Sequence, residues 1–413
     1  MQLIIHRGTR EIGGTVIELR TNRTSLLVDI GQPLNTNSAT VDISTLKPDA
    51  ALISHPHQDH YGLIDQLDPS VPVYIGALSK QLISATRIFL HQKLPDYDMN
   101  HFEKWRPFTI GDMTITPYLM DHSATDAYAF LIEAEGKRIF YSGDFRASGN
   151  KAFLFDRLLQ DPPRNVDLLL LEGTMMRRRS DQFPDEASVR RKIEAVLKDQ
   201  ENIAFLVASS QNIDRLVSAL HACERTEKIL VIDIYTAWVL ELVSQISTRV
   251  ATMEHDQVNV YADHSMDQCV KNNPGIFGNF RKRLYRQRVT KEKLNADPAG
   301  YLCYSKMSRF RTMGLYKRYG PINLIYSQWL GYLNQKNDTY FGAEQIAAFQ
   351  TDPQVNFTYA HTTGHATVET LAQLERCLQP GLTVPVHTEY PQDYSKHFSR
   401  VTRLKDGEPF ELM

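Results

Sequence analysis

The sequence predicts an α/β protein of two domains, and three observations lead to this prediction. First, its 413 residues are more than one ordinary hydrophobic core accommodates. Second, several short apolar runs end in His, Asp or Glu, and the sites of α/β folds are built at strand ends. Third, helical and strand-like segments alternate between residues 185 and 246, which is typical of a parallel sheet covered by helices.

The composition is that of an ordinary globular protein, and its net charge of −2 gives no overall attraction to nucleic acid. The four cysteines are scattered without a CxxC pair, which argues against a disulfide framework and a thiolate zinc site. The first residues form too short an apolar run for a signal peptide, and no stretch reaches the roughly 20 apolar residues that span a bilayer. We therefore expect a cytoplasmic protein with no membrane partner.

In chain order, a strand opens the N-terminus, and two more, at 15–19 and 25–29, are joined by a turn at Asn22. Asp29 ends the second of these. It is either an ordinary turn residue at a strand end or a group that orients a metal ligand. Further on, the expected elements are a strand at 71–75, a helix at 77–90, β-structure over 108–145, a helix at 185–199, a strand at 203–210, helices at 212–223 and 236–246 around a strand at 229–234, a strand at 356–360 and a helix at 368–378.

The densest chemical signal is Ser54-His55-Pro56-His57-Gln58-Asp59-His60-Tyr61-Gly62, between a buried strand at 50–53 and a helix predicted over 61–67. In an extended segment His55 and His57 point the same way, whereas Asp59 and His60 lie past the bend and address a second point. Imidazole and carboxylate together suit Zn²⁺ or another borderline divalent ion. The alternative is a surface loop that happens to be rich in His.

The same pattern of polar groups at strand ends recurs along the chain. A single polar residue at a strand end is expected by chance. Its repetition at several strand ends is what favours a functional site. The groups are His122, Asp144, Glu172, the run His361-Thr362-Thr363-Gly364-His365, and His387.

Residues 271–320 are strongly basic, with tyrosines interleaved, and include the run Arg281-Lys282-Arg283. Cations and aromatic rings together are what a groove for single-stranded nucleic acid uses, for phosphates and for base stacking. The alternative is a solvated helical face with anchoring aromatic residues.

Taken in order, these motifs resemble the β-CASP branch of the metallo-β-lactamase superfamily, and within that branch the ribonuclease J family. The run from His55 to His60 matches the HxHxDH signature, and Arg10-Glu11-Ile12-Gly13-Gly14 is similar to the family's opening turn. Asp29 and the strand-end groups described above match the remaining motifs, so the resemblance covers nearly the whole chain. Glu172-Gly173-Thr174 departs from the usual acidic-Ser-Thr and lacks a hydroxyl there.

The resemblance implies an αββα metallo-β-lactamase sandwich formed by residues 1–185 and 351–413, with an α/β β-CASP domain inserted at 186–350. The chain ends about 25 residues past His387, so we expect a short form without the family's extra C-terminal domain. This departure puts the family's usual oligomer in doubt and leaves a homodimer open.

The resemblance also implies a ligand set. His55, His57 and His122 would hold one Zn²⁺, and Asp59, His60 and His387 a second, with Asp144 bridging and Mn²⁺ as an alternative metal. It assigns catalytic roles to Asp59, Glu172 and His365, the last two as a pair that moves a proton to the leaving oxygen. His361, Thr362 and Thr363 would bind a phosphate, as would Arg281, Lys282 and Arg283. Glu172 as a helix cap and His361 as a structural histidine are the alternatives.

The implied function is hydrolysis of phosphodiester bonds in single-stranded RNA, endonucleolytic, 5′-exonucleolytic or both, through a hydroxide bound by two metals. Three alternatives remain at this point. One is a β-CASP nuclease that processes DNA, another is a small-molecule hydrolase of thioesters or lactones, and the third is a catalytically inactive RNA-binding scaffold.

Overall fold

A computed structural model describes residues 1–35, 38, 40–94, 99–178, 183–334 and 341–412, and the chain divides into two compact units. The first unit comprises Met1–Ser84, Leu94–Ser180 and Thr363–Met413, and the second comprises Ala85–Lys93 and Asp181–Thr362. The second unit continues to Thr362, past the predicted boundary at 350, because the strand Val355–Tyr359 pairs with the sheet of that unit.

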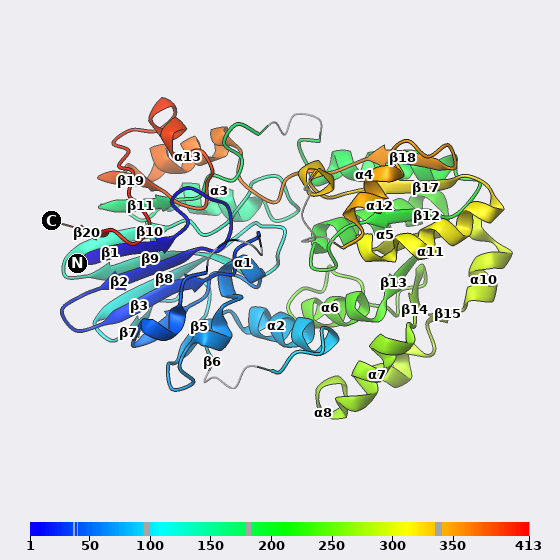
Figure 1. Cartoon of the computed structure of the whole chain (residues 1–413), viewed down its shortest axis with the longest axis horizontal. Coiled ribbons are helices and arrows are strands. Elements are labelled where there is room, and N and C mark those ends of the chain that lie inside the picture. The colour runs from blue at the N-terminus through cyan, green and yellow to red at the C-terminus, as the bar shows by residue number, and fades with distance from the viewer. Residues whose placement is uncertain (36–37, 39, 95–98, 179–182, 335–340, 413) are drawn as a thin grey trace. The chain divides into compact units, whose positions relative to one another are not determined.

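The first unit contains two β-sheets (Figure 1). One has the order β20 (Pro409–Glu411), β1 (Gln2–Arg7), β2 (Val16–Arg20), β3 (Ser25–Ile30), β4 (Ala50–Leu52), β5 (Val73–Ile75), β6 (Met99–His101). The other has the order β19 (Leu382–Pro385), β11 (Leu168–Leu171), β10 (Lys137–Tyr141), β9 (Ala127–Ala134), β8 (Met113–Met120), β7 (Phe108–Ile110).

Each of these sheets is antiparallel in one half and parallel in the other. β1, β2 and β3 form an antiparallel meander, whereas β3 to β6 run parallel, with Leu27 beside Ala51. In the second sheet β7 to β10 are antiparallel, and β10, β11 and β19 are parallel. Parallel neighbours end at the same edge of a sheet, so the polar segments that follow β10, β11 and β19 lie together at one edge of the second sheet.

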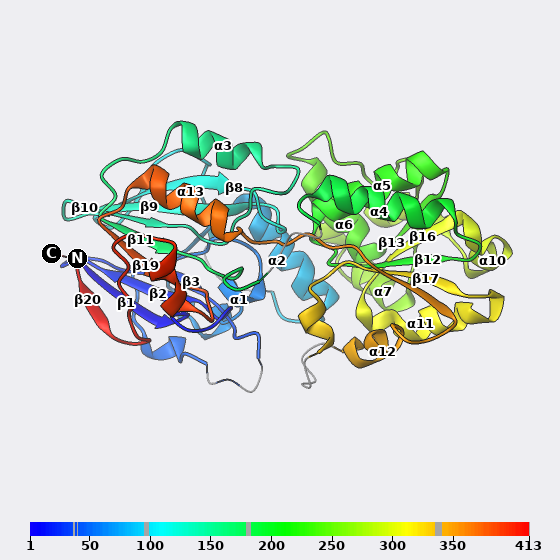
Figure 2. The same ribbon diagram turned by 90° about the horizontal axis from the view of Figure 1, so that it is seen from above.

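The two sheets pack face to face around one apolar core. Ile5 and Val28 from the first sheet and Phe130, Ile132 and Leu170 from the second belong to the same buried cluster. Burial of such side chains contributes about 1.5–3 kcal/mol each, so this interface is the main support of the strands. Figure 2 shows the sheets as two layers.

Helical layers cover the outer faces of both sheets. Helices α3 (Phe153–Gln160) and α13 (Val368–Leu378) pack Phe155 and Leu371 onto the sheet that contains β10 (Figure 2). On the opposite face, Ile64 and Ile83 lie in a second cluster with residues of β3, β4 and β5. Ile83 belongs to α2 (Ala77–Phe89), which runs from the first unit into the second. The predicted αββα layering of the first unit is therefore confirmed.

The second unit is a parallel sheet with helices, as the alternating pattern predicts. Its strands pair in parallel in the order β15 (Arg288–Val289), β14 (Val258–Tyr261), β13 (Ile229–Asp233), β16 (Tyr301–Ser305), β12 (Ala204–Val207), β17 (Ile322–Tyr326), β18 (Val355–Tyr359). Its helices are α4 (Glu186–Lys198), α5 (Ile213–Thr226), α6 (Ile234–Ser244), α7 (His264–Asn272), α8 (Pro274–Phe277), α9 (Phe280–Leu284), α10 (Lys291–Ala296), α11 (Phe310–Leu315) and α12 (Ala343–Ala348). None of the helices in the described ranges has the length and apolar character needed to cross a bilayer.

Candidate metal centre

The histidine-rich run leaves β4 as extended backbone and turns at once into a short helix. His55 follows the strand, His57 is the N-cap of α1 (Gln58–Tyr61), and Asp59 and His60 lie within that helix. The predicted helix over 61–67 is wrong, because α1 ends at Tyr61 with Gly62 as its C-cap. The bend between His57 and Asp59 lies where the sequence predicts it, and the helix begins at Gln58, three residues earlier than expected.

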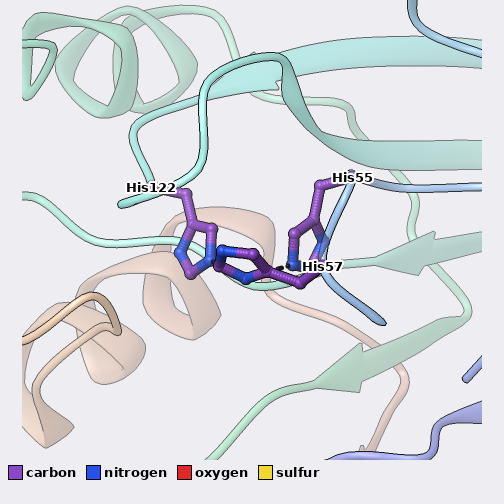
Figure 3. A group of neighbouring side chains, drawn as sticks. All are labelled: His55, His57 and His122. Carbon is purple, nitrogen blue, oxygen red and sulfur yellow. Dashed lines mark hydrogen bonds between the residues drawn. The ribbon is translucent and has the colours of Figure 1, made fainter. Parts of the chain in front are cut away.

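His55, His57 and His122 converge in the first of three groups among the described residues (Figure 3). His57 Nδ1 lies 3.1 Å from His55 Nε2 and 3.3 Å from His122 Nε2. Three ring nitrogens that face one another cannot all be satisfied by mutual hydrogen bonds, since each neutral imidazole has one donor and one acceptor. A cation shared by the three lone pairs would satisfy all of them.

The outer nitrogens of two of these rings are held by hydrogen bonds. His122 Nδ1 lies 2.6 Å from the carbonyl oxygen of Gly364, to which it can only donate. His55 Nδ1 lies 3.0 Å from Ser54 Oγ. A proton on Nδ1 leaves Nε2 with its lone pair, and this is the tautomer that a metal ligand needs.

The second group combines Asp59, His60, Asp144 and His387. Asp144 Oδ2 lies 3.1 Å from His60 Nε2, 3.5 Å from His387 Nε2 and 3.9 Å from His55 Nε2, which belongs to the first group. Asp59 Oδ2 lies 3.8 Å from His387 Nε2. Asp144 is thus the carboxylate that faces both groups.

Asp29 holds His60 from the side away from Asp144. Its buried carboxylate lies 2.7 Å from His60 Nδ1 and accepts hydrogen bonds from Ser54 N, Ser54 Oγ and Tyr141 Oη at 2.7–2.8 Å. A carboxylate that accepts from the outer nitrogen fixes the ring and makes the inner nitrogen more basic. Asp29 also has a φ of 58°, so its backbone takes the left-handed conformation at the end of β3.

The donor set fits divalent cations. Asp144 Oδ1 and His387 Nε2 are buried polar atoms for which the described residues provide no hydrogen-bond partner. Burial, together with the neighbouring imidazoles, lowers the pKa of His55 and His122 well below the usual value, and burial lowers the pKa of His57 to about 4. Neutral imidazoles and carboxylates are the ligands that Zn²⁺ and similar ions take.

A third group, Asp144, Glu172 and His365, adjoins the second. Glu172 Oε2 lies 3.1 Å from His365 Nδ1, and the carboxylate accepts hydrogen bonds from the backbone N–H groups of Phe145, Thr174 and Ala366 at 3.2–3.3 Å. Burial opposes protonation of His365, but the Glu172 carboxylate raises its pKa above the usual value. Glu172 does not cap a helix, because it lies directly after β11 and outside any helix.

Comparison with known proteins agrees with this geometry. Residues 27–231 match the family model described as the beta-lactamase superfamily domain. The chain carries a domain of the metallo-β-lactamase superfamily.

Curated relatives of this superfamily chain match most of its length. It is 23% identical over 407 residues to ribonuclease J of Helicobacter pylori, a match that covers 93% of this chain and 55% of that protein. It is 22% identical over 379 residues to ribonuclease J of Sinorhizobium meliloti, covering 88% of this chain and 63% of the relative. The chain thus spans somewhat more than half the length of these two relatives.

A solved structure shares the fold across the whole chain. The crystal structure of a protein of unknown function from Enterococcus faecalis V583 aligns with a TM-score of 0.77 at 18% identity, covering 100% of this chain and 99% of that chain. At this identity the likeness bears on the fold alone.

The other predicted substrate-binding residues of the superfamily chain fall in both units. His361 and Thr362 close the second unit, where His361 Nδ1 lies 3.1 Å from the carbonyl oxygen of Ser327. Thr362 Oγ1 is buried, and the part of the chain that the structure describes gives it no hydrogen-bond partner. Thr363 belongs to the first unit, and its Oγ1 accepts a hydrogen bond of 3.0 Å from the backbone N–H of His365. Their contact with a phosphate stays a prediction.

The predicted cationic run lies on α9, and two of its three members are engaged by carboxylates. Arg281 makes two hydrogen bonds, of 2.7 and 2.8 Å, to Asp267. Arg283 bonds to Glu241 at 2.7 Å and Glu254 at 2.8 Å. Lys282 is exposed. Phosphate binding by this run stays a prediction, but Arg281 and Arg283 would have to share their charge with partners in the second unit.

Sequence reasoning missed the groups that orient the ligands. Thr15 Oγ1 lies 2.9 Å from His387 Nδ1, and Ser54 and Tyr141 hold Asp29. Ser54 directly precedes His55, and Tyr141 precedes Asp144 by three residues; this closeness in sequence was the available signal. Thr15 is distant from His387 in the chain, and only the folded structure brings them together.

Proposed function

We propose that this chain is a metal-dependent nuclease of the ribonuclease J type, with the second unit as its β-CASP domain, and that it hydrolyses phosphodiester bonds of single-stranded RNA. The observation that carries the proposal is a pair of ligand groups with Asp144, a member of the second, 3.9 Å from His55 of the first, and with Glu172 and His365 in a third group that contains Asp144. The names of the two curated relatives support RNA as the substrate.

The residues divide into those that hold metals and those that move a proton. We propose that His55, His57 and His122 hold one Zn²⁺ and that Asp59, His60 and His387 hold another, with Asp144 between them. The imidazole-rich donor set favours Zn²⁺, and Mn²⁺ is the alternative. When bound, such a pair of ions supplies a water of lowered pKa and neutralises phosphate charge.

His365 is the proposed general acid. Glu172 holds its Nδ1, which leaves Nε2 to give a proton to the leaving oxygen of the phosphodiester. Burial opposes the charged ring, but the Glu172 carboxylate raises the pKa of His365 above its usual value, which favours the protonated form that a general acid requires. Asp59, whose side chain is partly exposed, has access to substrate or water.

The test is incubation of the protein with 5′-labelled and 3′-labelled RNA and DNA oligonucleotides of the same sequence, with Zn²⁺ or Mn²⁺ added. We expect RNA to be cut, and the two labels distinguish endonucleolytic from 5′-exonucleolytic cleavage. Asp144→Asn is the matched inactive control, since it removes the shared charge and keeps the side-chain shape.

Two outcomes would redirect the proposal. Preferential cleavage of DNA would assign the chain to the DNA-processing nucleases. Hydrolysis of a thioester or lactone with no cleavage of either nucleic acid would make it a small-molecule hydrolase and contradict the proposal.

A further inference from the structure

A groove of about 770 Å³ lies in the first unit, and none of its lining residues belongs to the ligand groups. One wall is a face of α13 that runs from Val368 to Arg376. The other walls are the segment 176–178 and residues of the segment 393–397. We call it the α13 groove.

The α13 groove carries an excess of positive charge in a chain whose net charge is −2. Its cationic residues outnumber its acidic ones, and one of the two acids is already engaged by cations from the groove itself. The charged lining comprises Arg177, Arg178, Arg376 and Lys396 against Glu369 and Asp393, with His397 beside them. This balance suits an anionic ligand.

The guanidinium group of Arg177 is held in place by Asp393 and Tyr390. Its Nε and Nη2 both bond to Asp393, and its guanidinium lies 4.6 Å from the ring centroid of Tyr390. Lys396 also pairs with Asp393, at 2.7 Å. The two bonds of Arg177 use one edge of the guanidinium, so Nη1 faces away from Asp393 and can donate to a ligand.

The backbone of Arg177 is in an unusual conformation. Its φ is 61°, in the left-handed region that residues with a side chain seldom adopt. Such strain persists where the surrounding structure imposes it, and it concentrates at sites that clamp ligands. The pairing with Asp393 and the stacking on Tyr390 supply that constraint here.

Short stretches of chain connect the groove to the proposed proton-transfer pair. Arg177 follows Glu172 by five residues, and α13 begins three residues after His365. The lined face of α13 rises about 12 Å from Val368 to Arg376, which is long enough for more than one phosphate of a strand. A strand leaving the general acid would therefore enter a cationic track.

We propose that the α13 groove binds the phosphate backbone of the nucleic-acid substrate on the side of the scissile bond that carries the leaving oxygen. This inference rests on the proposed nuclease function, and it assigns to the groove a binding role without a catalytic one. Because phosphate contacts position a strand and do not read its sequence, binding there should be independent of sequence.

The experiment compares two doubly substituted proteins with the same change of net charge. Arg376→Gln/Lys396→Gln removes two exposed cations of the groove, and Arg23→Gln/Lys405→Gln removes two exposed cations of the first unit outside it. Binding of a fluorescein-labelled 20-nucleotide RNA is followed by anisotropy from 50 to 300 mM NaCl, in EDTA so that no cleavage occurs. Thermal unfolding confirms that both variants fold.

The groove variant should bind RNA at least about tenfold more weakly at 100 mM NaCl. Its log–log salt slope should be shallower by about 1.4, since each phosphate contact on a single strand contributes roughly 0.7. The control variant should match the wild type. With metal restored, the groove variant should show a raised KM and a kcat within about twofold of wild type.

The side of the scissile bond is tested with uncharged methylphosphonate linkages on either side of the mapped cleavage position. A neutral linkage on the leaving-oxygen side should weaken binding to the wild type and to the control, but have little further effect on the groove variant. Equal effects on both sides would overturn that assignment.

The inference fails separately from the proposed function. If the groove variant binds RNA like the control, the α13 groove is not a backbone site, even if RNA is cleaved. If the groove variant loses binding of inorganic tripolyphosphate but not of RNA, the groove is a small-anion site and the inference is overturned. If the wild type binds RNA through the groove but cuts none, the nuclease proposal fails and the binding role stands.

Discussion

Replacing Asp29 with Asn tests whether this buried carboxylate controls the metal centre. The change keeps the shape of the side chain, and Asn tolerates the φ of 58° at this position. The carboxylate accepts from Ser54 N, Ser54 Oγ, Tyr141 Oη and His60 Nδ1. In either orientation of the Asn amide, its NH₂ group faces at least one of these hydrogen-bond donors, which then loses its acceptor.

Two effects of different size should follow. Loss of the carboxylate that orients a ligand typically reduces metal affinity by about 10–100-fold, or roughly 1.4–2.8 kcal/mol. A buried donor left without an acceptor costs about 1–3 kcal/mol in the free energy of unfolding. We therefore expect the Asn variant to fold with lowered stability, and to hold its metal distinctly more weakly.

Metal affinity is measured by titration of Zn²⁺ against a fluorescent chelator, and stability by urea unfolding of the metal-free protein. Asp167→Asn is the matched control: Asp167 accepts a hydrogen bond of 2.8 Å from Arg138 N and immediately precedes β11, at the end opposite Glu172. The control should lose stability without losing metal affinity. If Asp29→Asn binds Zn²⁺ as tightly as the wild type, Asp29 is only a turn residue at a strand end, and the reasoning is refuted.

Three further predictions address the site and the fold. Gly31→Ala should cut turnover by more than tenfold, because the added Cβ would lie 1.8 Å from the carbonyl oxygen of Asp59; an unchanged kcat would contradict this close packing. Native mass spectrometry after reconstitution should find two divalent ions per chain, and Asp144→Ala should abolish turnover with an unchanged circular dichroism spectrum; a single ion in the wild type would exclude the paired arrangement. Glu18 should contribute up to about 3 kcal/mol of stability at neutral pH, because burial opposes its ionisation but its bonds to His6 and Arg20 lower its pKa to about 2. A lowered folded-state pKa means that this contribution is complete above about pH 4.5 and is lost as the pH falls towards 2, so Glu18→Gln should flatten the loss of stability in that window.

The position of the candidate site could be predicted because its proposed ligands follow a local rule. The alternation of side chains in an extended segment places His55 and His57 together, and this needs no knowledge of the fold. Strand ends carry Asp144 and His387, and the parallel halves of the sheets bring those ends to one edge. The two-group arrangement follows from these local regularities and from the order of the motifs.

What holds the ligands could not be predicted in the same way. Thr15 and Tyr141 reach their partners through contacts between segments that are far apart in the sequence. The boundary of the second unit also depends on a contact within the fold. β18 pairs with β17, and no change in composition after residue 350 indicates this pairing. The helix expected over 61–67 fails for a local reason, because Gly62 ends α1 at its C-cap.

Basic runs in the sequence predicted accessible cationic surfaces less well than the motifs predicted the candidate metal site. The run on α9 is basic in sequence, yet Arg281 and Arg283 are satisfied by carboxylates from other segments of the second unit. Arg376 lies in a segment with no basic run, and the structure places it in a groove with three further cations. The net charge of a surface depends on ion pairs between residues that are distant in the chain. The cationic surfaces of the folded protein therefore differ from the basic runs of the sequence.

The departure at Gly173 illustrates the same dependence at the site itself. A Cβ at this position would lie 2.0 Å from Tyr394 Oη, so the buried tyrosine requires a glycine here. Tyr394 Oη donates to the carbonyl oxygen of Leu171 at 3.1 Å, and Thr388 Oγ1 donates to that of Gly173 at 3.0 Å. The hydroxyl groups of Thr388 and Tyr394, which follow β19, thus fasten the strand end that carries Glu172. Because the buried phenol of Tyr394 occupies the space that a side chain at 173 would need, the glycine is a condition of this arrangement.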